Sequence, residues 1–381
     1  MKPPRLELSP ELRWVMSRAF APLELGSATG ALASPERALE LAVALDLVGR
    51  IATRQPHDRL LTELGVEPAR KLQMLRLRVV ALNQILARTT ELVLHTAAPL
   101  GARVVLLKHA ALRALGVVEP GARDARDVDV LVDGSLAGAL HDALCEQGFR
   151  IASAQHPEQH LPTLLREPGE VVELHHTLAG LAVPGGNGAS AASLLVAQGY
   201  TTPSPGSRAH VPVPALLAAH ALVHGLVQHR TATDLYPALR TICDLCDLNF
   251  ANVDDVACRA FVSSELSGAA IDAVHTVVAA LSAGADPRDM GESSPGFELF
   301  AHLVAGAVDP DYQQALFLEG RHLASAVRAR LTSFRPTATS ERPGAPAAAH
   351  GAEVRRVATR VARSCAGYAR LKLRRGQRFR V

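Results

Sequence analysis

A short run of alternating residues in the middle of the chain constrains its fold most. Asp127-Val-Asp-Val-Leu-Val132 sets two carboxylates among apolar, mostly β-branched residues, which is typical of a strand with one buried face. Successive strand side chains point to opposite faces, so Asp127 and Asp129 share one face and the valines beside them face the core. The two carboxylates repel each other, and a divalent cation between them relieves the repulsion. A solvated strand end gives the same pattern, so the neighbouring segments decide between the two interpretations.

The segments on both sides of this strand alternate between strand and helix patterns. Residues 103–108 form a short β-branched run that predicts a strand, and the Ala/Leu segment that ends at Gly116 predicts a short helix. Asp133 offers an N-cap for a helix that runs to about Gln147 and is closed by Gly148. These segments predict an α/β unit that carries the two aspartates on one of its strands.

A turn-centred pattern follows this unit and predicts two antiparallel strands. Residues 161–166 and 170–175 are strand-like and flank a Glu-Pro-Gly turn at 167–169. Glu173 alternates with apolar neighbours on the second strand, so we expect a third carboxylate to join the two aspartates. The sheet is therefore expected to be mixed, and the core to span residues 101–182.

Both flanks of the core have helical hydrophobic spacing. Residues 183–214 are rich in Gly, Pro and Ser and predict a loop with a short helix near 191–198, after which the helical period returns. The fold class is therefore α+β (mixed α/β), with a small mixed-sheet core between helical regions. The expected regions are an N-terminal helical region (1–100), the core (101–182), a C-terminal helical region (183–335), a Pro/Ala-rich linker (336–352) and a basic amphipathic tail (353–381).

The net charge of +3 hides two parts of opposite sign. Residues 353–381 carry ten basic residues and one acidic residue, whereas residues 1–352 carry a formal charge of −6. Apolar residues recur at helical spacing in the tail, so we expect an amphipathic helix with a basic face. Such a helix suits an anionic surface, and three interpretations stay open: an arm that docks on the acidic body, a site for RNA or another polyanion, and a membrane-surface anchor.

The cysteine count and the apolar stretches indicate a cytoplasmic protein. The five cysteines are an odd number and are scattered along the chain, which favours a reducing compartment. Apolar stretches end short of the roughly 20 residues that cross a bilayer, so no transmembrane segment is expected.

Cys243 and Cys246 have redox spacing in a helical pattern and are interpreted as buried helix residues. His220 and His224 share a helix face and are interpreted as packing residues rather than metal ligands.

Several common catalytic motifs are absent from the sequence. It contains no Walker phosphate-binding loop, no Gly-x-Gly-x-x-Gly fingerprint and no Gly-x-Ser-x-Gly elbow. The sequence therefore lacks the usual signatures of kinases with a Walker loop, dinucleotide-dependent enzymes and serine hydrolases.

Three motifs together resemble a known family. They are Leu106-Leu-Lys-His-Ala-Ala-Leu112, Arg123-Asp-Ala-Arg-Asp-Val-Asp-Val-Leu-Val132 and Val171-Val-Glu-Leu-His175. As a set they resemble the uncharacterised bacterial nucleotidyltransferase family of the DNA polymerase beta-type superfamily, whose usual signatures are Leu-Lys-Gly, Arg…Asp-Ile-Asp-Leu-Leu-Val and Glu-Leu-His. The resemblance covers most of residues 80–250.

The resemblance implies metal-dependent transfer of a nucleoside monophosphate from a nucleoside triphosphate to a hydroxyl-bearing acceptor. The acceptor is unknown and is a protein, a peptide, RNA or a small molecule. Asp127, Asp129 and Glu173 are then the metal ligands and catalytic carboxylates of a two-metal Mg²⁺ site. The nucleotide-binding residues are then Lys108, His109, Arg123 and Arg126, whose cationic groups pair with phosphate oxygens.

One position departs from the family pattern. His109 stands where the family has a glycine that lets phosphates approach the backbone. A protonated imidazole would donate a hydrogen bond to a phosphate, whereas a merely bulky one would close the site. Two alternatives therefore stay open beside nucleotidyl transfer: a catalytically silent binding or scaffold protein with this fold, and phosphoryl transfer on the same site.

Overall fold

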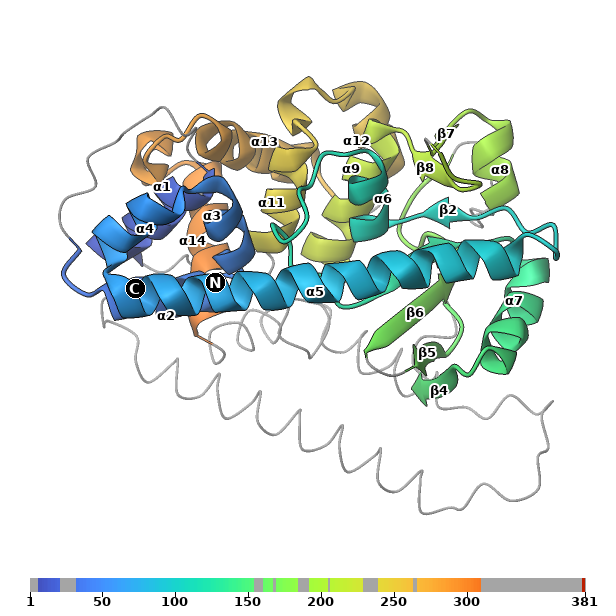
Figure 1. Cartoon of the computed structure of the whole chain (residues 1–381). Helices are drawn as coiled ribbons and strands as arrows, with labels where there is room; N and C mark the ends of the chain where they lie inside the picture. Colours follow the sequence, from blue (N-terminus) through green and yellow to red (C-terminus); the bar gives the residue numbers. More distant parts are fainter. Residues whose placement is uncertain are drawn as a thin grey trace, which may run out of the picture.

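The chain folds around a mixed sheet, which confirms the α+β class (Figure 1). The computed structural model describes residues 6–20, 32–153, 160–166, 169–183, 192–204, 206–228, 239–262, 266–309 and 379–380. Within these residues a seven-stranded sheet has the order β4-β5-β6-β3-β2-β8-β7. Its strands are β2 (Val105–Leu106), β3 (Val128–Leu131), β4 (Arg150–Ser153), β5 (Thr163–Arg166), β6 (Glu170–His175), β7 (Thr201–Pro203) and β8 (His210–Pro212).

The central strand β3 carries the predicted aspartate motif. It runs antiparallel to β2 and parallel to β6, so the sheet is mixed as predicted. Strands β5 and β6 pair antiparallel, which confirms the predicted hairpin; residues 167 and 168 of its turn lie outside the described residues. Asp129 pairs in register with Glu173. Because neighbours in register share a face, the structure brings the third carboxylate beside the second.

The loop expected over 183–214 is wrong in part. The short helix is present as α8 (Ala192–Ala197), but β7 and β8 follow it and extend the sheet. Strand β8 joins the sheet through a parallel pairing of His210 with Val105 of β2. Each of these strands has only three residues and contains a proline, so their composition favours a turn when it is considered alone.

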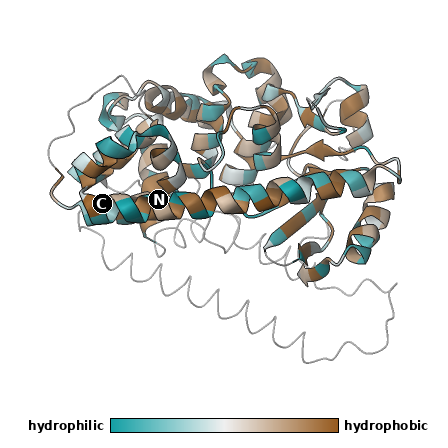
Figure 2. Ribbon diagram, viewed as in Figure 1, coloured by the Kyte–Doolittle hydropathy of each residue, from teal (hydrophilic) through white to brown (hydrophobic). Residues whose placement is uncertain are grey.

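One long helix spans the molecule beside the sheet. Helix α5 (Val66–Ala97) has 32 residues and runs along the length of the molecule in Figure 1. Leu72, Val79, Leu86 and Val93 recur every seven residues and are all buried, and Figure 2 shows hydrophobic and hydrophilic residues alternating along the helix. This spacing packs one stripe of α5 against α3 (Val48–Arg54) and α4 (His57–Leu64), and against β3, β6 and α7 (Gly134–Glu146).

Two further helices lie close to the strand ends that carry the motifs. Helix α6 (Lys108–Ala114) begins directly after β2 and packs against β3 and β8. Helix α9 (Pro214–Leu222) contacts α6 and β8 and continues into the π-helical segment η1 (Val223–Gln228). The motif residues therefore lie between the sheet and these helices.

The N-terminal and C-terminal helices pack on each other at the end of the molecule away from the sheet (Figure 1). Two ion pairs link them: Arg50 Nη1 lies 2.7 Å from Asp247 Oδ2, and Arg240 Nε lies 2.7 Å from Asp46 Oδ2. The N-terminal helices are α1 (Pro10–Phe20), α2 (Pro35–Ala44), α3 (Val48–Arg54) and α4 (His57–Leu64). The C-terminal elements are α11 (Leu239–Asp247), η2 (Phe250–Asn252), α12 (Asp255–Val262), α13 (Gly268–Ser282), η3 (Pro287–Met290) and α14 (Pro295–Val308).

The remaining structural predictions concern two helix cysteines, the linker and tail, and transmembrane segments. Cys243 is buried in α11 and Cys246 is half-buried there, both as free thiols, which supports their interpretation as helix-packing residues. The linker and the amphipathic tail lie outside the described residues, apart from β9 (Phe379–Arg380), which pairs parallel with β1 (Leu6–Glu7). No helix among the described residues is long and apolar enough to cross a membrane.

Candidate functional site

Lys108 lies where β2 ends and α6 begins. Its backbone has a φ of +44°, a left-handed conformation that costs a residue other than glycine about 1 kcal/mol or more. The side chain is 15% exposed, and its Nζ lies 2.6 Å from Asp129 Oδ1 and 4.0 Å from Glu173 Oε2. A strained helix start therefore places an ammonium group against two carboxylates.

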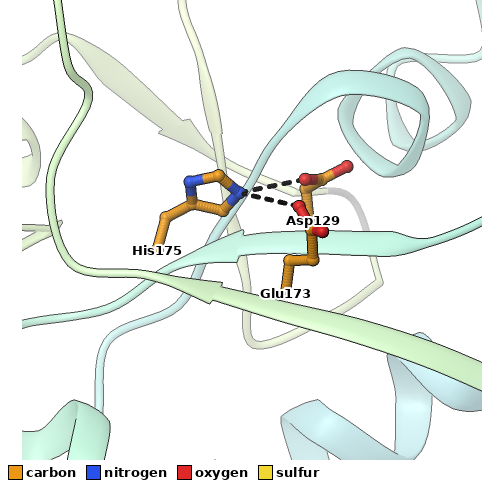
Figure 3. Close-up of side chains that lie close together, drawn as sticks. All are labelled: Asp129, Glu173 and His175. Carbon is orange, nitrogen blue, oxygen red and sulfur yellow. Dashed lines mark hydrogen bonds and ion pairs between the residues drawn. The ribbon is translucent and has the colours of Figure 1, made fainter. Parts of the chain in front are cut away.

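The side chains of Asp129, Glu173 and His175 converge on one point above the sheet (Figure 3). His175 Nε2 lies 3.0 Å from Asp129 Oδ1 and 3.7 Å from Glu173 Oε2. Glu173 and His175 are two residues apart on β6, so the strand alternation puts both on the face of Asp129. Among the described residues, these three form the group of metal-ligating side chains whose donor atoms all lie within 4.8 Å of one another.

Asp127 lies just before β3 and is half-buried. It is not part of the group formed by Asp129, Glu173 and His175. Burial, followed by the nearby charge of Asp129, raises the pKa of Asp127 above its usual range. The two aspartates of the motif thus have different surroundings: Asp129 contacts a lysine and a histidine, whereas Asp127 is an acid in a poorly solvated position.

The site holds more carboxylates than cationic groups. Burial, together with the charge of Asp129, raises the pKa of Glu173 to about 8. Asp129 is buried too, yet the nearby Lys108 ammonium and the His175 hydrogen bond hold its pKa well below the usual value. Lys108 is the counterpart: despite its burial, these carboxylates raise its pKa. One lysine therefore compensates one carboxylate, and two acids remain in surplus.

This donor set fits a divalent cation. Surplus carboxylates that repel each other lose that repulsion when a cation lies between them. Carboxylate oxygens suit Mg²⁺, and the His175 nitrogen adds a ligand type that Mn²⁺ or Zn²⁺ accepts more readily. His175 was missed as a candidate in the sequence, although its two-residue spacing from Glu173 is the signal that would have found it.

His220 of α9 is a second residue near the site whose sequence pattern does not indicate its position there. It is 4% exposed and lines a small cavity together with Lys108, Arg123 and His224. Burial and then the charge of Lys108 lower the pKa of His220 to about 3, so its ring is neutral at pH 7. The π-helical segment η1 begins three residues later, and such segments are frequent at functional sites. His220 therefore packs in a helix, as predicted, but next to the carboxylate site.

His109 is buried inside α6 rather than exposed toward a phosphate. It is 4% exposed, and neither ring nitrogen has a hydrogen-bond partner among the described residues. Burial and the charges of Arg123 and other nearby arginines lower its pKa to about 3, so the imidazole is neutral. In these surroundings His109 is therefore not the protonated imidazole that would donate a hydrogen bond to a phosphate.

The two candidate arginines differ in their surroundings. Arg123 donates two hydrogen bonds to the carboxylate of Asp244 on α11, at 2.7 and 3.0 Å. Arg126 is 75% exposed, and its Nη2 lies 3.9 Å from Asp124 Oδ2. Arg123 is thus engaged in a structural ion pair, whereas the exposed Arg126 has room to move.

Comparison with known proteins identifies one match. A family model described as uncharacterised nucleotidyltransferase matches residues 32–269, which is more than half of the chain. That range contains Lys108, the aspartate motif, His175 and the helix that carries His220. No curated protein and no solved structure matches.

Proposed function

Because the chain belongs to this uncharacterised nucleotidyltransferase family, we propose that it transfers a nucleoside monophosphate from a nucleoside triphosphate to a hydroxyl-bearing acceptor, as DNA polymerase beta-type enzymes do. The observation that carries the proposal is the cluster of Asp129, Glu173 and His175 beside Lys108. A buried surplus of carboxylates next to one lysine suits a site that holds a divalent cation and meets a polyphosphate.

The reaction forms one bond and breaks one. The acceptor oxygen bonds to the α-phosphorus, the bond from that phosphorus to the β-bridging oxygen breaks, and pyrophosphate leaves. The acceptor hydroxyl loses its proton in this step. Glu173 or Asp127, in its ionised form, would accept it as a general base; burial raises the pKa of both carboxyls above their usual values, which makes each a stronger base. One proton thus moves from the acceptor to a carboxylate of the site.

Asp127, Asp129 and Glu173 would hold Mg²⁺ ions, with His175 as a further ligand. Bound there, the metal would stabilise negative charge on the phosphates as the bond breaks. The Lys108 ammonium group would leave Asp129 and pair with a phosphate oxygen, and the exposed Arg126 would pair with another phosphate oxygen. Arg123 would orient the loop before β3 through its ion pair with Asp244.

Isothermal titration with Mg²⁺ and each of four nucleoside triphosphates tests the proposal. Wild type should bind at least one triphosphate in a Mg²⁺-dependent manner, and Asp127→Asn and Asp129→Asn should lose that dependence. Pyrophosphate among the products supports nucleotidyl transfer, and a nucleoside diphosphate supports phosphoryl transfer. Wild type that binds no triphosphate with Mg²⁺ would contradict the proposal.

A catalytically silent binding protein is the second candidate, and the buried ring of His109 favours it. This ring occupies the start of α6, where the family has glycine. His109→Gly distinguishes the two candidates. If the ring obstructs the site, the variant should bind triphosphate more tightly than wild type; if the ring takes part in binding, the variant should bind it more weakly.

A further inference from the structure

A cleft of about 320 Å³ opens between α5 and α6. Its lining includes Arg88 and Glu91 of α5, His109 and Arg113 of α6, and Asp127 at the start of β3. The small cavity beside Lys108, which also borders Arg123 and His220, shares no lining residue with it. The consecutive residues Lys108 and His109 therefore face two different spaces, and Asp127 borders the larger one. Its volume is in the range of small-molecule sites.

His109 lines this cleft, and its two ring nitrogens are buried hydrogen-bonding atoms that the neighbouring residues do not use. A neutral imidazole has one N–H donor and one nitrogen acceptor, and both lack a partner among the described residues. Leaving such atoms buried and unpaired is costly, so a ligand gains affinity when the ring turns and brings one of them to the cleft. A hydroxyl group can donate to one ring nitrogen or accept from the other, whereas a carboxylate can only accept from the N–H.

The two arginines that line the cleft favour an anionic group on the part of a ligand that reaches α5 and α6. Arg88 and Arg113 line the cleft and are exposed, and Arg113 Nη1 donates a long hydrogen bond, of 3.4 Å, to the backbone oxygen of Asn83. Among the charged side chains of α5 and α6, Glu91 balances one of the two arginines, so one positive charge remains there for the anionic group of a ligand. The Asp127 carboxylate, at the start of β3, brings the formal charge of the named lining residues to zero and offers an acceptor to a group that donates a hydrogen bond, such as a hydroxyl.

We propose that this cleft binds the acceptor, and that the acceptor is a hydroxyl-bearing molecule with one anionic group, a carboxylate or a phosphate. The inference rests on the proposed nucleotidyl transfer. In-line displacement requires the attacking oxygen and the leaving group on opposite sides of the phosphorus. With phosphates at Lys108, an acceptor hydroxyl in the separate cleft meets Asp127, while its anionic group pairs with Arg113 or Arg88.

The test uses three small probes of similar size: D-glycerate, glycerol 3-phosphate and uncharged glycerol. Their binding to the full chain is measured by saturation-transfer NMR titration. At least one anionic probe should bind about tenfold or more tightly than glycerol, as expected for a charge-assisted hydrogen bond. Preference for glycerate or for glycerol 3-phosphate identifies the anionic group. Equal binding of all three probes, or binding of none, would overturn the proposal.

Variants locate the bound probe. Arg113→Gln should reduce the affinity of the anionic probe about tenfold without changing that of glycerol. Arg208→Gln alters an exposed arginine that follows Ser207 of the cleft lining but does not itself line the cleft, and it should change neither affinity. His109→Leu should weaken binding, and His109→Gln, which restores a donor and an acceptor, should recover part of it. Ala110→Trp fills the cleft from α6 and should abolish probe binding. Unchanged probe binding in Arg113→Gln and Ala110→Trp would overturn the location.

A nucleotide titration separates this inference from the proposed function. Ala110→Trp should bind Mg²⁺ and triphosphate as wild type does. If the variant instead loses triphosphate binding while folded, the cleft is the nucleotide site and the acceptor assignment is wrong. If wild type binds the probes in the cleft but no triphosphate, the cleft stands as a ligand site and nucleotidyl transfer fails.

Discussion

The Nζ atom of Lys108 lies 2.6 Å from Oδ1 of Asp129, and both side chains are largely removed from solvent. An ammonium group therefore contacts the carboxylate that the proposed metal would also need. Monovalent and divalent cations compete for such an oxygen, because each relieves the same repulsion. Triphosphate offers the ammonium group a new partner, so nucleotide binding and metal binding should favour each other.

Replacement of Lys108 tests this competition directly. Lys108→Met leaves the carboxylates without their cation, so Mn²⁺ binding without nucleotide should tighten about tenfold. Triphosphate affinity should fall by a similar factor, and the mutual enhancement should shrink. Isothermal titration with Mn²⁺, with and without a non-hydrolysable triphosphate, measures all three effects. Lys71→Met, an exposed lysine of α5, is the matched control and should behave as wild type; weaker Mn²⁺ binding by Lys108→Met would exclude competition.

The two aspartates of β3 should differ in their effect on stability. Asp129→Asn leaves a buried lysine without its nearest carboxylate, which should lower the free energy of unfolding by about 3 kcal/mol. Asp127→Asn removes a carboxylate whose pKa is already raised by burial and by Asp129, so metal-free stability should stay within about 0.5 kcal/mol or rise. Urea denaturation with a chelator measures both variants. Equal destabilisation would show that the two carboxylates have equivalent surroundings.

His109 should make stability depend on pH. Its pKa is about 3 in the folded protein because the ring is buried, against about 6.5 in an unfolded chain. Between these values the unfolded chain binds more protons, so stability rises with pH, by up to about 1.4 kcal/mol per pH unit for one group. His109→Asn should flatten this rise between pH 5 and 7. Denaturant titrations at both pH values are the measurement, and an unchanged slope contradicts a neutral buried ring. His160, His175 and His220, whose pKa values burial also lowers, add slope of the same sign in both proteins, whereas Glu173, whose pKa is raised, adds slope of the opposite sign in both.

Replacement of Arg123 should lower the stability of the protein, whereas replacement of Arg126 should weaken triphosphate binding. Arg123→Gln leaves Asp244 without its bidentate partner in a mostly buried pair, so we expect a loss of about 3 kcal/mol in stability. Arg126→Gln alters an exposed side chain and should change stability by less than about 0.5 kcal/mol, while weakening triphosphate binding. Thermal unfolding and nucleotide titration on both variants give the comparison. An Arg126→Gln variant with wild-type triphosphate affinity would remove Arg126 from the proposed phosphate contacts.

The sequence predicted the strands whose side chains alternate clearly. Strand β3 and the β5–β6 hairpin follow from alternation and from a Pro-Gly turn, which are local signals. Strand β8 has no such signal: its place in the sheet depends on a parallel pairing of His210 with Val105, residues more than a hundred positions apart. Non-local pairing of this kind is decided by tertiary packing, so composition alone predicted a loop.

The candidate site was predictable to a similar extent. Asp127, Asp129 and Glu173 were found through strand alternation, and the structure brings Glu173 into register with Asp129. The separation of Asp127 from the Asp129 group was not predictable, because it depends on which carboxylate Lys108 contacts. His220 reaches the site from α9 through helix packing, and its sequence pattern is that of an ordinary buried helix residue.

The pairing of β8 with β2 also has a practical consequence for anyone who wishes to isolate the chemical core. A fragment ending at residue 182 would expose the edge of β2, with unpaired N–H and C=O groups that template association with other chains. The short β2 strand, which positions Lys108, would also lose one of its two neighbours. The smallest fragment with a protected edge therefore extends at least to Pro212.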